Sequence, residues 1–152
     1  MTDTPSTGHA LGAGLDLETL NLMLETLDDF VTQALPPELQ LDLDHEDRCP
    51  EDIVRMMSDP EQLGVTAAFI PAAYDGMDGG AFDSYRICEL MARKDLGLGT
   101  AVFATFLGSD PIVVGATEEQ KGDWLGAIAR DGVVFTPRTD KFLWAYDMDV
   151  AE

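Results

Sequence analysis

The stretch from Gly64 to Gly132 decides the fold, and it reads GVTAAFIPAAYDGMDGGAFDSYRICELMARKDLGLGTAVFATFLGSDPIVVGATEEQKGDWLGAIARDG. Apolar residues recur in it at the spacing of α-helices, and turns rich in Gly and Pro separate the helical segments. No nucleophile in it lies beside a base, so the sequence supplies no catalytic residue. The stretch therefore predicts helices and turns of an all-α domain.

Two helices are predicted in the middle of this stretch, over residues 82–96 and 97–107. The inward candidates of the first are Tyr85, Cys88, Leu90 or Met91, and Leu96. The second helix is almost wholly apolar, and a helix that is apolar all round is expected to be buried all round. It is therefore predicted to be the central helix.

The ends of the stretch carry local signals for turns and for a last helix. Residues 65–70 are predicted to be extended and residues 74–80 to form a turn. After a short turn over 111–115, Thr117-Glu118-Glu119-Gln120 matches a capping box, which predicts a helix to about Arg130. Gly132 is the expected residue to close that helix.

Upstream, apolar residues spaced by three and four predict a helix over residues 16–35, with Asp16 as its N-cap. Pro36-Pro37 is expected to end it. An acidic connector follows, and a further helix is predicted to start at Pro50, with Gly64 just beyond its end.

These segments predict one irregular or orthogonal all-α bundle of about five to six helices. Its expected boundaries are a disordered lead over 1–14, the helical domain over 15–132 and a divergent tail over 133–152. A chain of 152 residues is long enough to bury a substantial core.

The net charge of −20 argues against binding nucleic acid or an anionic membrane, because both require a basic face. The acidic surface either only solvates the chain or meets a basic partner. No membrane span and no secretory signal are predicted. The two cysteines indicate neither a disulfide framework nor a zinc site, and the expected compartment is the cytoplasm.

Two patterns suggest ligand sites and are better explained as structure. The acidic cluster Asp42, Asp44, His45, Glu46 and Asp47 does not match the spacing of a calcium-binding loop, so a solvated loop is expected and no metal is predicted. The Gly97-Leu98-Gly99 run lacks the preceding strand of a phosphate-binding loop. Close helix packing, or the start of a helix, explains it.

Several short motifs occur in a distinctive order, and it is their combination that is informative. They are Leu63-Gly64-Val65 leading to Ile70-Pro71, Tyr74 with Gly76-Met77 and Gly79-Gly80, Glu89 to Asp95, Gly108 to Ile112, and Gly115 to Lys121 followed by Trp124-Leu125. In this order they resemble the N-terminal all-α domain of the acyl-CoA dehydrogenase family. Asp75 departs from the family, which usually has a glycine there.

The resemblance implies a flavoprotein that oxidises an acyl-CoA thioester, with FAD as cofactor. It places the catalytic glutamate on a C-terminal helical domain and most FAD contacts on that domain and a middle β domain, so this chain alone is not expected to bind FAD. The implied acyl-pocket wall comprises Gly99, Thr100, Phe103, Ala104 and Leu107. Phe103 either limits the depth of that pocket or belongs to the core.

After Gly132 the family continues with a Thr-Glu-Pro segment and then Gly-Ser-Asp, whereas this chain has Thr136-Pro137 and neither motif. Two hypotheses follow. The chain is either a part of a dehydrogenase that needs acyl-CoA and the missing domains, or a non-catalytic helical module that binds a partner or itself. A helical protein that binds acyl groups without oxidising them is a third, weaker alternative. An apolar set in the tail favours association; it comprises Phe135, Phe142, Leu143, Trp144 and Tyr146.

Overall fold

The computed structural model describes residues 14–133, which form six α-helices and two short 3-10 helices with no strand in that range. The elements are α1 (Leu17–Ala34), α2 (Pro37–His45), α3 (Glu51–Ser58), η1 (Val65–Phe69), η2 (Ala72–Tyr74), α4 (Ala81–Lys94), α5 (Leu96–Gly115) and α6 (Glu118–Asp131). The all-α prediction is confirmed. Residues 1–13 of the predicted lead over 1–14, and residues 134–152 of the predicted tail over 133–152, lie outside the described residues.

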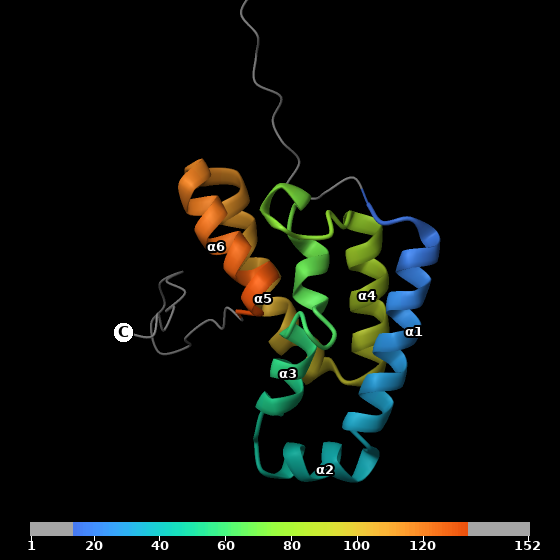
Figure 1. Ribbon diagram of the computed structural model, residues 1–152. Helices are drawn as coiled ribbons and strands as arrows, with labels where there is room; N and C mark the ends of the chain where they lie inside the picture. The colour runs from blue at the N-terminus through green and yellow to red at the C-terminus, as the bar shows by residue number, and fades with distance from the viewer. Residues whose placement is uncertain (1–13, 134–152) are drawn as a thin grey trace, which may run out of the picture.

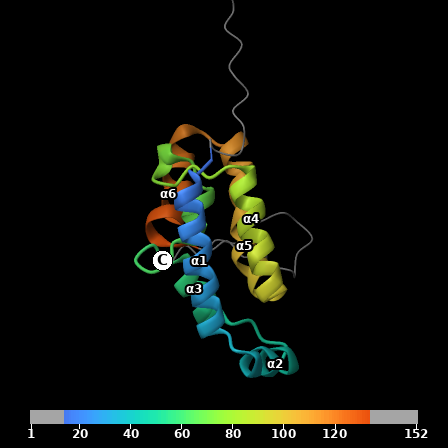
Figure 2. The same cartoon turned by 90° about the vertical axis from the view of Figure 1, so that its right-hand side faces the viewer.

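α5 contacts α3, α4, α6 and η1, and α1 packs on the bundle through α4. α4 contacts α5, and the two helices lie side by side in Figure 2; α6 packs on α5 (Figure 1). η1 packs between α3, α5 and α6. α2 lies across the lower end of the bundle in the same views. The prediction of α5 as the central helix is therefore confirmed by its contacts.

The Pro36-Pro37 pair ends one helix and begins another. Asp16 caps α1 as predicted, accepting a hydrogen bond from the Thr19 amide at 2.9 Å. The expectation of an irregular acidic connector after Pro37 was wrong, because α2 begins at Pro37. Proline is well suited to the first turn of a helix, where its missing N–H would have no partner. The acidic residues that suggested a loop lie largely on this short helix.

The predicted extended segment over 65–70 is a 3-10 helix instead. Gly64 was expected just beyond the end of the helix that begins near Pro50, but α3 already ends at Ser58; Gly64 instead precedes η1 in the left-handed conformation, with φ of 56°. After η1 the chain folds back on this 3-10 helix, and carbonyls of η1 accept hydrogen bonds from amides of the turn over residues 77–79. The Met77 amide donates to Ala67 O at 2.9 Å and the Gly79 amide to Ala68 O at 2.8 Å. These bonds satisfy backbone groups of residues 67 and 68 within the loop, whereas an extended strand would need a neighbouring strand to pair with them.

α5 corrects two expectations at once. It runs through Pro111 to Gly115, where a turn was predicted, and it is not buried all round. The side chains of Leu96, Leu107 and Val114 are 69%, 65% and 73% exposed. The apolar composition of α5 therefore indicated correctly that the helix is central, but the packing leaves one of its faces exposed. Of the inward candidates of the helix predicted over 82–96, Leu90 and Met91 are buried, whereas Tyr85 is exposed on α4 and Leu96 is exposed at the start of α5.

The core has two parts. The larger joins α1, α3, α4, α5 and η1, and its most deeply buried side chains include Leu20, Leu27, Met57, Ile87, Met91 and Leu98. The smaller lies between η1 and α6 and contains Ile70, Leu125, Ile128 and Ala129. Together they bury the inward faces of every long helix, which is the main stabilising contribution in a domain of this size.

Both predicted ends of α6 are confirmed. Thr117 Oγ1 accepts from the Gln120 amide at 3.3 Å, and Gln120 Oε1 accepts from the Thr117 amide at 3.0 Å. Gly132 ends the helix with φ of 65°. Near the helix start, Glu118 accepts hydrogen bonds from Lys121 at 2.9 Å and from the Tyr74 hydroxyl at 2.8 Å, and these hold the pKa of Glu118 below its usual value.

Replacing Thr66 by Val is expected to raise the free energy of unfolding by about 1 kcal/mol. The Thr66 side chain is 2% exposed, and its hydroxyl has no hydrogen-bond partner among the described residues. Val keeps the shape and removes a polar group that is buried without compensation. Chemical denaturation measures the change. As a control, Thr117→Val should lower stability by about 1 kcal/mol because it removes an N-cap. A loss of stability in the Thr66 variant would contradict the prediction.

Candidate functional site

One face of α5 presents an apolar stripe to the surface of the described chain. We call it the α5 stripe, and its residues, spaced by three and four along the helix, are Leu96, Thr100, Phe103, Leu107, Pro111 and Val114. All of them are exposed except Phe103, which is partly buried. A largely apolar and exposed row of side chains on a central helix is characteristic of a binding surface or a domain interface.

Phe103 belongs to both the stripe and the core. Its ring packs edge-on against Phe69, with centroids 5.6 Å apart and an interplanar angle of 65°. Phe69 also contacts Phe106, with centroids 5.0 Å apart. Such aromatic contacts orient a ring as well as burying it. The two alternatives for Phe103 are therefore compatible, since the core fixes one part of the ring and the other part remains at the surface.

The predicted pocket residues do not all lie on one face of α5. Thr100 and Leu107 are exposed on the stripe, whereas Gly99 and Ala104 are buried. A Cβ added at Gly99 would lie 3.3 Å from the Cβ of Met91, so Gly99 allows α4 and α5 to approach closely. The glycine in this run thus serves helix packing, as the sequence suggested.

Sequence reasoning missed the part of the stripe beyond Leu107. The spacing continues through Pro111 to Val114, and this periodicity could have revealed it, but the proline suggested a turn. Because proline has no N–H, the Leu107 carbonyl lacks the usual helical bond from residue 111. The neighbouring Asp110 is partly buried, which raises the pKa of its carboxyl.

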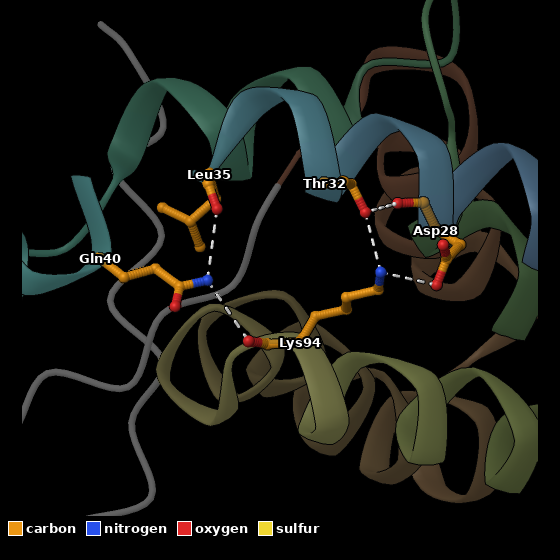
Figure 3. Close-up of polar contacts among 5 residues, drawn as sticks. All are labelled: Asp28, Thr32, Leu35, Gln40 and Lys94. Carbon is orange, nitrogen blue, oxygen red and sulfur yellow. Dashed lines mark hydrogen bonds and ion pairs between the residues drawn. The ribbon is translucent and has the colours of Figure 1, made fainter. Parts of the chain in front are cut away.

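A polar junction fixes the lower end of the bundle (Figure 3). Lys94 Nζ, at the end of α4, lies 2.9 Å from Asp28 Oδ1 and donates to Thr32 Oγ1 at 2.8 Å, both on α1. Gln40 Nε2, from α2, donates to the carbonyls of Leu35 at 3.3 Å and Lys94 at 3.4 Å. Lys94 is thus committed to a structural contact that joins α1, α2 and α4.

Two adjoining hollows lie beside this junction, and they share Leu43, Arg48, Cys49 and Pro50 in their linings. Their volumes are about 420 and 450 Å³. Carboxylates dominate their polar lining, and the one cation there, Arg48, pairs with Glu46 at 2.9 Å. The pyrophosphate of FAD would be repelled by this charge, so these hollows do not fit the cofactor.

The described residues contain no group of three or more Asp, Glu, His or Cys side chains that could hold a metal ion. Cys49 and Cys88 are both free thiols. The acidic cluster over 42–47 therefore lies on and after α2 without forming a metal centre in this part of the chain.

The described helices thus define an all-α domain whose central helix carries the exposed α5 stripe. Residues 18–131 match the family described as acyl-CoA dehydrogenase, N-terminal domain. The chain therefore belongs to the acyl-CoA dehydrogenase N-terminal domain family. No solved structure gives a significant match.

α5 is long and apolar enough to cross a membrane by length and composition alone. The same properties are common in the core helix of a water-soluble domain. Here α5 contacts α3, α4, α6 and η1, so it is packed within the described part of the chain.

Proposed function

We propose that this chain acts as the N-terminal α domain of an acyl-CoA dehydrogenase-like flavoprotein and supplies one wall of the acyl pocket. The wall consists of Thr100, Phe103 and Leu107 on the α5 stripe. Gly99 and Ala104 lie behind it and allow α5 to pack closely against the rest of the domain. FAD and the catalytic base would come from the other domains that the family places around this one.

The exposed apolar stripe is the single observation that carries this proposal. Leu107 is 65% exposed, although it lies near the middle of the most apolar helix in the described chain. Leaving such a side chain in water loses about 2 kcal/mol of burial energy. A second domain or an acyl chain laid against the stripe would recover that energy. Phe103, held by Phe69, would then limit how deeply the acyl chain enters.

The proposal predicts that activity appears only when the described domain is combined with the family's middle and C-terminal domains. The purified chain is combined with the middle and C-terminal domains of a family member, expressed without its own N-terminal domain. We expect the mixture, but neither part alone, to reduce a dye when given acyl-CoA and FAD. Phe103→Ala should shift the preferred acyl chain toward greater length by at least about 10-fold in relative kcat/KM, because loss of the phenyl ring opens space for further methylenes of the substrate and a single methylene is worth about that much.

Ala101→Ser is a suitable control for this experiment, because it changes the same helix at a partly buried position outside the proposed wall. It should leave the chain-length preference unchanged. A mixture that forms a stable complex but shows no turnover with acyl-CoA substrates of any length would contradict the proposed dehydrogenase role. A preference unaffected by Phe103→Ala would contradict the wall assignment alone.

The alternative of a non-catalytic interaction module is supported by the same exposed side chains, Leu96, Leu107 and Val114. Such a module would use the α5 stripe to bind another protein or a second copy. Sedimentation at low and high salt distinguishes the two functions. Self-association through the stripe would strengthen at high salt, where repulsion between the acidic chains is screened.

A further inference from the structure

The two hollows beside α2 form one groove that the proposed acyl pocket does not use. We call them together the α2–α3 groove. Its apolar floor consists of the partly exposed Ala34 and Leu39, with the buried Leu35, Leu43, Ile53 and Leu98 behind them, and its polar rim of Gln40, Asp44, Asp47, Arg48, Glu51, Asp52 and Asp95. The Arg48-Cys49-Pro50 connector, between α2 and α3, contributes to both halves. The groove therefore combines an apolar floor with an acidic rim.

The frame of the groove is held by polar contacts on both sides. Gln40, in its wall, ties α2 to the ends of α1 and α4 (Figure 3). Asp95, on the opposite side, caps α5 by accepting from the Leu98 amide at 2.6 Å. The bond from Gln40 to the Lys94 carbonyl connects α2 to the end of α4, 54 residues away in sequence, so this wall of the groove depends on the tertiary structure.

The rim is strongly and almost uniformly negative. Among the described residues, no Lys or Arg lies within ion-pairing distance of Asp44, Asp47 or Glu51. Arg48, the cation of the lining, pairs with Glu46 at 2.9 Å. The negative charges of the rim also affect the Cys49 thiol, which lines the groove. Burial, followed by the charges of Glu51 and Asp95, raises the pKa of Cys49.

We propose that the α2–α3 groove binds a cationic amphipathic segment of another protein, with apolar side chains on the floor and Lys or Arg side chains against the rim. Charge complementarity selects this occupant. A second copy of the chain would bring its own excess negative charge, since the net charge is −20, and would be repelled. A small anion is excluded for the same reason, and the carboxylates form no metal-binding group among the described residues.

Cys49 allows the groove to be observed directly. It is exposed, it lines both hollows, and Cys88 is the only other cysteine in the sequence. In a Cys88→Ser chain, the rate of reaction with neutral N-ethylmaleimide therefore reports on Cys49 alone. A bound segment should cover the thiol and slow this reaction, without depending on any property of the α5 stripe.

The test uses a synthetic helical peptide of Lys and Leu at amphipathic spacing, and a control peptide in which Glu replaces each Lys. Saturating Lys–Leu peptide is expected to slow Cys49 labelling about 10-fold at low salt, whereas the Glu–Leu peptide has no effect. Asp44→Asn with Asp47→Asn should weaken peptide binding about 10-fold, because two rim charges of this kind contribute modestly but additively. Asn also tolerates the positive φ of 50° at residue 47.

The matched control is Glu18→Gln with Glu25→Gln, which removes the same charge from exposed positions on α1 that do not line the groove. It should change the affinity less than 2-fold. Equal losses in the two double variants would show general charge attraction and overturn the proposal. Peptide binding without protection of Cys49, no binding at all, or protection that rises with chain concentration when peptide is omitted would also overturn it.

Discussion

Replacing Gly76 by Ala is expected to lower the free energy of unfolding by about 3–5 kcal/mol, a large part of the total stability of a typical domain. A Cβ at this position would overlap the carbonyl group of Ile70 and clash with the Ile70 side chain. Ile70 is 1% exposed and belongs to the core between η1 and α6. Neither group can move away without disrupting the loop.

The carbonyl that blocks this position is itself held in place. Ile70 O accepts a hydrogen bond from the Asp78 amide at 3.0 Å, within the same turn that folds back on η1. Relief of the clash would break this bond or displace Ile70 from the core. The requirement for glycine at position 76 therefore comes from the close approach of two backbone segments.

Chemical denaturation followed by circular dichroism measures the effect. The matched control is Gly122→Ala in α6, where an added Cβ meets no atom within 4 Å. Alanine should stabilise that helix by about 0.5–1 kcal/mol, because it is the better helix former. A Gly76→Ala chain within 1 kcal/mol of the parent would show that the loop adapts, and would contradict the prediction.

The second large effect is expected for Asp83→Ala, at about 2–4 kcal/mol of lost stability. The Asp83 side chain is buried at the start of α4, in a residue only 2% exposed. Its Oδ2 accepts from the amides of Leu15 and Gly80, each at 2.8 Å. Removing the carboxylate leaves both amides without their partner and releases the segment before α1 from the start of α4.

Hydrogen exchange gives a specific readout for this variant. The Leu15 and Gly80 amides should lose protection, whereas amides in α6 should not. Asp83→Asn retains an acceptor oxygen and should lose only about 1 kcal/mol. Asp123→Ala, at an exposed position on α6, should change stability by less than about 0.5 kcal/mol. Unchanged exchange at Leu15 in the Ala variant would contradict the proposed clamp.

These two positions illustrate what sequence patterns can and cannot reveal. Gly76 was recognised as part of a glycine-rich turn, but its partner, the Ile70 carbonyl, appears only when the loop closes on η1. Asp83 lies in an ordinary first turn of a helix, where an acidic residue is expected from the helix dipole alone. Its bond to Leu15 spans 68 residues, and no local signal indicates it.

The candidate site likewise has features that the sequence revealed and features that only the folded structure shows. The resemblance identified the family and directed attention to α5, and the helical spacing places Thr100, Phe103 and Leu107 on one face. The sequence could not show that this face is the uncovered one, because α5 is apolar on every side. The α2–α3 groove was not predicted at all, since its walls come from separate helices and α2 itself was expected to be a loop.

The sequence by itself determined the helices with strong local signals, namely α1 from its N-cap and periodicity and α6 from its capping box and terminal glycine. These features depend on bonds between residues a few positions apart, so local physics is sufficient to specify them. The tertiary structure alone decided that the 65–80 loop closes on itself, that α5 continues through Pro111, and which faces remain exposed. Those outcomes depend on which distant groups supply hydrogen bonds and cover apolar surface, and such partners are defined only when the chain has packed.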